Sequence, residues 1–272
     1  EWAPKRIKFR QKILPFFDEF TAVGKYGTGC IYEFLKNKIL KNKGKIFLNH
    51  QVVNFKKENI FIKKIYFKNK KSINLDNNTL ILSSLPVTIT ARLLGFASSL
   101  KFRGVRTIYI SISKDKVLPK KCHWIYYASK NIIFNRVSEH KKMSKYVSPK
   151  NKTYLSAEIS YSKNDKIDKL SFNEIKKIVE KDLIKVGLVK KNEILRFSEN
   201  KEDFVYPVQF TEYKTELAKT NSAISKFRQI YSLGTGGEFN YADSQILFHK
   251  SMDLVDILTN KESMDNQVLR NH

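Results

Sequence analysis

The sequence has few of the residues that build disulfide scaffolds and metal sites. Its 272 residues contain two cysteines, Cys30 and Cys122, and these do not form a CxxC pattern. Neither a disulfide framework nor a zinc site is therefore indicated. The five histidines show no HExxH spacing either. We expect no bound metal.

Long apolar runs are also missing. Residues 80–100 (LILSSLPVTITARLLGFASSL) approach the length of a membrane span, but Pro86, Arg92 and many hydroxyl residues interrupt them. A strand, a turn and a helix fit this segment better. The chain opens with EWAPKRIKFR, which lacks the charged and then apolar pattern of a signal peptide. We interpret it as a piece of a longer frame and expect a cytoplasmic location.

Acidic residues are scarce beside basic ones, at 26 against 51, which gives a formal net charge of +25. Such a charge raises the question of a nucleic-acid partner. However, 42 of the basic residues are lysines and nine are arginines, spread over nearly every segment without an Arg-rich stripe. A solvated surface explains this distribution better than a nucleic-acid site does, and a functional basic face stays open as the alternative.

Helix and strand patterns alternate in the first hundred residues. After the Gly-rich turn GKYGTG, apolar residues recur at helical spacing over residues 30–43, and Gly44 follows as a cap. The stretches KIFLNHQVVNF, NIFIKKIYFKN and INLDNNTLILSSLP are rich in Ile, Val, Phe and Tyr, which predicts strands. Pro86 ends the last of them, and TITARLLGFA predicts a short helix.

From Arg106 on, the pattern is typical of an antiparallel sheet. TIYISISK, HWIYYAS, NIIFNRVS and TYLSAEISYS follow one another at regular intervals. A helix then begins at a capping box, Ser171 to Glu174, and ends at Gly187. A short strand (QIYSL), a Gly-rich loop and a last helix over residues 243–258, with Asp243 as N-cap, complete the chain. We predict a mixed α/β fold of the α+β type.

The loop after QIYSL, SLGTGGEFNYADSQ, has the glycines of a nucleotide site but fits neither common template. A P-loop would end in GK and Ser or Thr, whereas Glu238 and Phe239 follow Gly237. A dinucleotide fingerprint would have a third Gly at position 239 and a further parallel strand after the helix. What remains is a loop that lets backbone N–H groups approach a ligand at the positive end of a helix, or a simple turn.

Several stretches together resemble the C-terminal two-thirds of the FAD-dependent amine oxidase superfamily, in particular its protoporphyrinogen-oxidase-like and UDP-galactopyranose-mutase-like members. They are EWAPKRIKF, GKYGTG with the helix and strand that follow, LILSSLP, CHWIYYASKNIIFNRVSE, YPVQFTEY and LGTGGEFNYADSQ. The order of these motifs agrees with the family. One departure is Thr235, which stands where the family has an Arg.

The resemblance implies FAD as cofactor and three segments of chain. Residues 1–100 would form part of a Rossmann-like FAD-binding domain, residues 101–215 a substrate domain made mostly of antiparallel sheet, and residues 216–272 the return to the flavin domain. The family's GxGxxG unit would lie upstream of Glu1, in the same chain or in a partner chain. The fragment alone would then bind FAD weakly and be inactive.

The resemblance also implies site residues. For the cofactor these are Val52, Leu85, Pro86, Gly234, Gly236, Gly237, Phe239 and Tyr241. For a small or sugar-containing substrate they are Trp124, Tyr126, Arg136, Tyr206 and Tyr213. Ordinary packing is the alternative for the aromatic residues. Arg136 could form a bidentate contact with a phosphate or carboxylate of the substrate. The alternative for Arg136 is a structural ion pair with Glu139 or Glu158.

The function that these features favour is an FAD-dependent oxidoreductase that takes a hydride from an organic substrate, with surface-glycan or nucleotide-sugar metabolism as a subordinate version. No general acid or base can be named, because hydride transfer to a flavin needs mainly orientation and a dry pocket. The alternatives are a non-catalytic basic module for nucleic acid or an anionic glycan, and an inactive, truncated flavoprotein relative.

Overall fold

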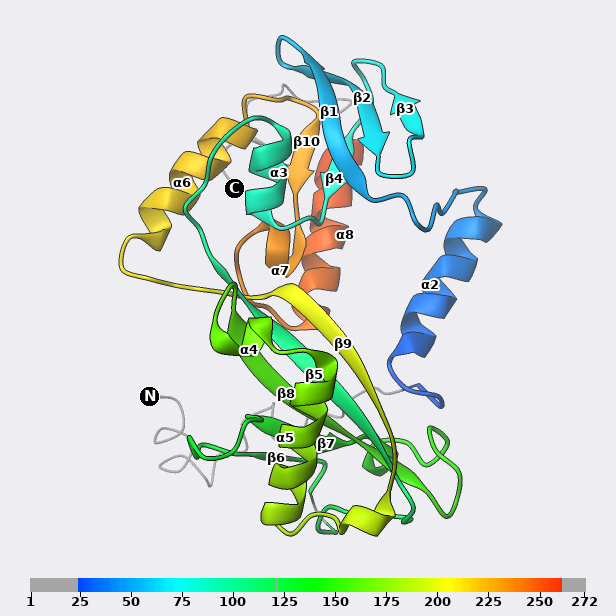
Figure 1. Cartoon of the computed structure of the whole chain (residues 1–272). Helices are drawn as coiled ribbons and strands as arrows, with labels where there is room; N and C mark the ends of the chain where they lie inside the picture. Colours follow the sequence, from blue (N-terminus) through cyan, green and yellow to red (C-terminus); the bar gives the residue numbers. More distant parts are fainter. Residues whose placement is uncertain (1–23, 121, 261–272) are drawn as a thin grey trace, which may run out of the picture.

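Strands with one apolar face build the largest sheet of the molecule. In the computed structural model, which describes residues 24–120 and 122–260, five antiparallel strands lie in the order β6-β7-β8-β5-β9 (Figure 1). They are β5 (Phe102–Ile112), β6 (Trp124–Tyr126), β7 (Arg136–Glu139), β8 (Thr153–Ser162) and β9 (Ile194–Pro207). The predicted antiparallel sheet and the mixed α/β fold class are thus confirmed.

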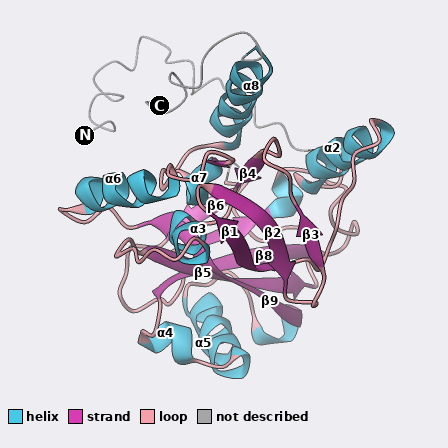
Figure 2. Ribbon diagram, turned by 90° about the horizontal axis from the view of Figure 1, so that it is seen from above, coloured by secondary structure: helices cyan, strands magenta, loops and turns pink. Residues whose placement is uncertain are grey.

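One face of this sheet is covered by helix α5 (Phe172–Lys185), which follows the short helix α4 (Lys166–Lys169), as Figure 2 shows from above. The predicted capping box is present, since the Ser171 hydroxyl accepts from the Glu174 N–H and the Glu174 carboxylate accepts from the Ser171 N–H. Alternate strand residues such as Ile108, Ile110 and Leu155 pack against the apolar stripe of α5. This packing forms the first apolar core.

Two smaller sheets lie beyond the ends of the long strands. The antiparallel sheet contains β1 (Val52–Glu58), β2 (Phe61–Phe67) and β3 (Ser72–Asn74), and the parallel pair contains β4 (Ile81–Ser83) and β10 (Ile230–Ser232). The accompanying helices are α2 (Gly29–Lys41), α3 (Val87–Leu93), α6 (Tyr213–Ile224), α7 (Gly234–Gly237) and α8 (Ser244–Asn260). None of the described helices is long and apolar enough to cross a membrane, and residues 80–100 form β4 and α3.

A second apolar core joins these small sheets to α3 and α6, with Phe55, Ile62, Leu94 and Ile230 among its buried residues. The Gln229 side chain is buried beside this core and makes two hydrogen bonds to the backbone. Its Oε1 accepts from the Ile62 N–H at 2.6 Å, and its Nε2 donates to the Asp76 carbonyl at 2.6 Å. The Gln229 amide thus supplies hydrogen-bond partners to the backbone of Ile62 in β2 and of Asp76. Buried polar groups need such partners.

The structure also corrects local expectations. Residues 45–50 and 131–134 lie outside strands. After α2 the left-handed residue is Lys43, with φ of 62°, rather than the Gly44 that follows it. The strand β9 was not predicted because five of the fourteen residues of ILRFSENKEDFVYP are charged. It forms an edge of the sheet, where charged side chains reach water. The helix α6 was missed as well.

A close contact fixes the start of β5 against β8. Gly104 lies opposite Tyr161, and the register of β5 with β9 shifts at the same place, between Arg103 and Val105. The Tyr161 ring is buried, and its hydroxyl donates to the Asp203 carboxylate. A Cβ at position 104 would overlap this ring. Only glycine leaves room for it.

We therefore expect Gly104→Ala to lower the free energy of unfolding by about 2 kcal/mol, the usual cost of overpacking a dense core. Urea unfolding monitored by circular dichroism measures the change. Gly29→Ala is the matched control, because nothing lies within 4 Å of a Cβ at position 29. Equal midpoints for the wild type and Gly104→Ala would show that the Tyr161 ring can move away without cost.

Candidate functional site

The Gly-rich loop packs against the end of strand β4. Because β10 runs parallel to β4, both strands end at the same edge, and the Leu233 N–H donates to the Ser83 carbonyl at 2.9 Å. A Cβ on Gly236 would lie 3.3 Å from the Pro86 Cα, and one on Gly237 would lie 3.0 Å from the Ser83 carbonyl oxygen. These two glycines allow close packing of two backbones. The carboxyl ends of parallel strands are also where ligands bind in open α/β sheets.

Gly234 differs from the other two glycines. Its φ of 79° is left-handed, and a Cβ placed on it would meet no atom within 4 Å. Next to it, the buried Oγ of Ser232 has no hydrogen-bond partner in the described part of the chain. An open backbone position beside an unpartnered hydroxyl suits a polar ligand.

The loop does not lead directly into the terminal helix, which corrects the expectation that the glycines face the positive end of that helix. Gly234–Gly237 form the single turn α7, and α8 begins only at Ser244. The turn ends because Phe239 is left-handed, with φ of 54°, and its ring is buried. That ring packs edge-on against Phe102 at 5.0 Å between centroids.

The aromatic residues assigned to the site separate into two groups. Phe239 and Tyr213, whose ring centroids lie 6.2 Å apart, belong to the second apolar core. Tyr241 is 60% exposed, and its ring lies 5.3 Å from that of Tyr206 at the end of β9. Tyr241 therefore connects the Gly-rich loop with the five-stranded sheet. Burial raises the pKa of Tyr206, and Tyr241 raises it further.

The second face of the five-stranded sheet, which we call the hydroxyl-rich face, carries polar and aromatic side chains. Its residues alternate with those that pack on α5, and strand pairing sets them in rows. The first row contains Tyr126, Arg136, Glu158 and Thr107, the second Trp124, Ser138, Ser156 and Tyr109, and the third Tyr154 and Ser111. Three of the five predicted substrate residues, Trp124, Tyr126 and Arg136, thus share one face.

Arg136 is held by an ion pair. Its Nη2 donates to Glu158 Oε1 at 2.6 Å and its Nη1 to the Tyr126 hydroxyl at 3.3 Å. Burial disfavours the charged guanidinium, but Glu158 and Tyr126 outweigh it and raise the pKa of Arg136 above its ordinary value. Glu158 is thus the partner, and Glu139 is buried elsewhere, where it accepts from the Val117 and Leu118 N–H groups. Substrate contact by Arg136 stays a prediction.

His140, which no sequence pattern pointed to, lies beside this group. Its ring stacks on Tyr154 at 4.9 Å and 12°, and its Nε2 is 2.9 Å from the Ser156 Oγ. Burial lowers the pKa of His140, Glu158 opposes this, and Arg136 adds to it. The alternation of TYLSAEISYS could have identified Glu158 and Ser156 on one face, but the position of His140 depends on the turn after β7.

The remaining predicted cofactor residues divide between two places. Leu85 and Pro86 adjoin the Gly-rich loop, with Pro86 preceding the first turn of α3. Val52 begins β1 in the separate antiparallel sheet, opposite Phe67. A cleft of about 980 Å³ runs along β10 between α6 and α8, and Ser232 and Gly234 belong to its lining. The described residues contain no group of three or more His, Cys, Asp or Glu that could hold a metal ion.

Solved structures share this fold. A reduced UDP-galactopyranose mutase aligns with a TM-score of 0.72 at 20% identity, over 86% of this chain and 51% of that one. A putative protoporphyrinogen oxidase from Exiguobacterium sp. 255-15 aligns with a TM-score of 0.64 at 14% identity, over 85% and 51%. Putrescine oxidase bound to putrescine gives 0.55 at 14% identity, over 86% and 53%.

The chain therefore spans about half the length of the solved structures it matches. No protein-family model matches the sequence, and no curated protein matches it. At these identities the likeness shows a shared fold, which agrees with the fold expected from the resemblance to the FAD-dependent amine oxidase superfamily.

The lowered pKa of His140 predicts a pH dependence. Below its ordinary value of 6.5, the unfolded state takes up a proton that the folded state resists. The free energy of unfolding should therefore fall as the pH drops from 7 to 5, and His140→Gln should flatten that slope. Urea titrations at several pH values measure it. An unchanged slope in His140→Gln would contradict the assignment.

Proposed function

We propose that this chain forms the substrate-facing half of an FAD-dependent oxidoreductase, which transfers a hydride from an organic substrate to the flavin. The observation that carries the proposal is the contact between Tyr241 and Tyr206. It brings the loop at the ends of the parallel strands to the row that contains Arg136 and Glu158. A cofactor at the loop would thus lie beside a substrate on the hydroxyl-rich face.

The residues present fit such a cofactor. Gly234 leaves space for close approach of a ligand to the backbone, and the buried Ser232 Oγ offers an unpartnered hydrogen-bonding group beside it. Gly236 and Gly237 hold the loop against Ser83 and Pro86, so that its position is fixed. FAD, when bound, supplies the two-electron acceptor.

The chain's own residues orient the substrate. In the reaction a C–H bond would break, the hydrogen would pass with both electrons as a hydride to the flavin, and an adjacent O–H or N–H would release its proton to water. Tyr126 and Tyr206 offer rings and hydroxyls for orientation, and Arg136, held by Glu158, offers a fixed positive charge. Proximity and orientation are the main demands of such a transfer. A redox-neutral reaction on a sugar substrate would use the same groups.

We also propose that a further segment, of the same chain or of a partner, completes the cofactor site. Parallel sheets normally have several strands and are covered on both faces. Among the described residues, β4 pairs only with β10. Leu82 on β4 is exposed, and so are Tyr32, Phe34 and Leu40 on α2, a helix without buried residues. A strand beside β4, followed by a helix, would cover Leu82.

The test is the visible absorption spectrum of the protein purified from its complete reading frame, with the released cofactor identified after denaturation. We expect flavin bands and released FAD. Gly236→Val should lower the flavin content severalfold, because its side chain meets the Pro86 backbone, whereas Gly29→Ala should leave it unchanged. A colourless protein that takes up no added FAD would overturn the enzyme proposal and favour the basic binding module or an inactive relative.

A further inference from the structure

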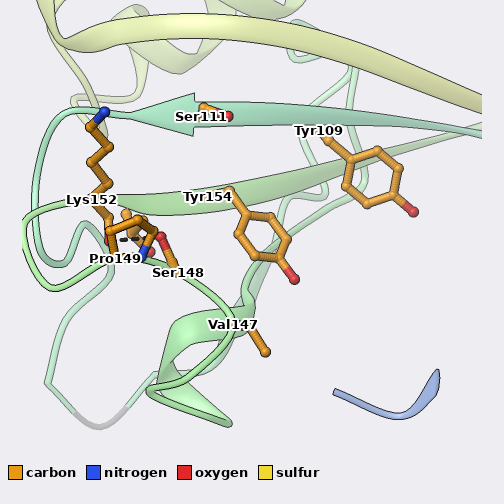
Figure 3. Close-up of a pocket in the computed structure, with 8 residues that line it drawn as sticks. Tyr109, Ser111, Val147, Ser148, Pro149, Lys152 and Tyr154 are labelled. Atoms are coloured by element: carbon orange, nitrogen blue, oxygen red, sulfur yellow. Dashed lines mark hydrogen bonds between the residues drawn. The ribbon is translucent and has the colours of Figure 1, made fainter. Parts of the chain in front are cut away.

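A cavity of about 330 Å³ lies at the far end of the hydroxyl-rich face (Figure 3). Its floor is formed by Tyr109 and Ser111 of β5 and by Tyr154 of β8, and its wall by Val147 and Ser148 of the loop before β8. Figure 3 shows both phenol rings directed to the same side of the two strands. Two aromatic rings and several hydroxyl-bearing residues therefore line one space.

The lining of the cavity combines apolar surface with hydroxyl groups, and part of its hydrogen-bonding capacity is free. Ser148 Oγ donates to the Lys152 carbonyl at 2.9 Å, which shapes the loop. The hydroxyls of Tyr109, Ser111 and Tyr154 form no hydrogen bond with one another, as Figure 3 shows. Burial raises the pKa of Tyr154, with Tyr109 adding to the rise, so the Tyr154 hydroxyl stays protonated and can donate.

The cavity continues the substrate site. Glu158 in the first row and Tyr154 in the third are four residues apart on β8, which places them about 13 Å apart at the rise of an extended strand. Between them lies Ser156, which is buried and is bonded to the His140 ring that stacks on Tyr154. A substrate that reacts beside Tyr206 would pass over this ring for its other end to enter the cavity.

The Gly-rich turn GKYGTG, which no other function accounts for, lies beside the same loop. The Ser144 hydroxyl donates to the Lys25 carbonyl at 2.5 Å, and the rings of Tyr26 and Tyr146 meet edge-on at 6.4 Å. Gly27, with φ of 98°, approaches the side chain of Val147. This turn supports the wall of the cavity from outside.

We propose that this cavity is a distal subsite that binds one hydroxyl-rich ring of the size of a monosaccharide, at the end of the substrate remote from the reacting bond. The inference rests on the proposed function, which it deepens. Sugar rings combine apolar C–H faces with hydroxyl groups at their edges. The rings of Tyr109 and Tyr154 would contact the C–H faces, and the hydroxyls of Tyr109, Tyr154 and Ser111 would bond the sugar hydroxyls. An apolar ring would leave these hydroxyls unpaired, at a cost in affinity.

The test uses the protein from its complete reading frame and saturation-transfer NMR with two probes, methyl β-galactopyranoside and N-acetylglucosamine. We expect at least one sugar to bind, and the double variant Tyr109→Phe/Tyr154→Phe to weaken binding at least about fivefold, since it removes two hydroxyl donors and keeps both rings. Tyr127→Phe is the matched control, because Tyr127 packs against Phe134 in the first apolar core.

The subsite is overturned if neither sugar binds the wild type, if the double variant binds as tightly as the wild type, or if cyclohexanol binds in place of the sugars. The flavin content of the same samples is read from their absorption spectrum. FAD without sugar binding would refute the distal subsite alone, and sugar binding without FAD would refute the oxidoreductase while keeping the cavity as a carbohydrate site.

Discussion

The arrangement of the site depends on the close approach of two backbone segments that lie about 150 residues apart in the sequence. Gly236 and Gly237 lie against Pro86 and Ser83 at distances that leave no room for larger side chains. This contact joins the end of β10 to the end of β4 and directs the following residues over the five-stranded sheet. Tyr241 reaches Tyr206 as a result.

The five-stranded sheet serves two purposes because successive residues of a strand face opposite sides. One side is apolar and packs on α5, which supplies the burial that stabilises it. The other side carries the rows of Tyr, Ser, Arg and Glu that we assign to the substrate. The packed apolar side thus fixes the strands that carry the polar side chains. Ion pairs such as that of Arg136 with Glu158 restrain these polar side chains further.

The high positive charge adds little to the stability of the fold through ion pairs. Most ion pairs among the described residues join lysines to carboxylates that are at least partly exposed, and such pairs contribute little to stability. Arg106 is different: it is buried, and it bonds Glu199 and the carbonyls of Ile167 and Leu170, so that it joins β5 to the turn before α5. Charge matters in this fold where it is buried and paired.

The sequence by itself determined the features that depend on near neighbours in the chain. The capping box at Ser171, the alternation of β8 and the glycine that ends α5 were all readable, because propensity and periodicity act over a few residues. Those patterns were enough for the mixed α/β fold class, whereas the grouping of Trp124, Tyr126 and Arg136 came from the resemblance to the family.

Only the tertiary structure decided what depends on distant contacts. It paired Arg136 with Glu158, buried Phe239 in the second core with Tyr213 packed against that core, and placed His140 against Tyr154. It also made a strand of the charged segment β9, which local propensity does not favour, because β5 offers it an edge to pair with. Strand register and the packing of two backbones set these positions, and neither leaves a local pattern in the sequence.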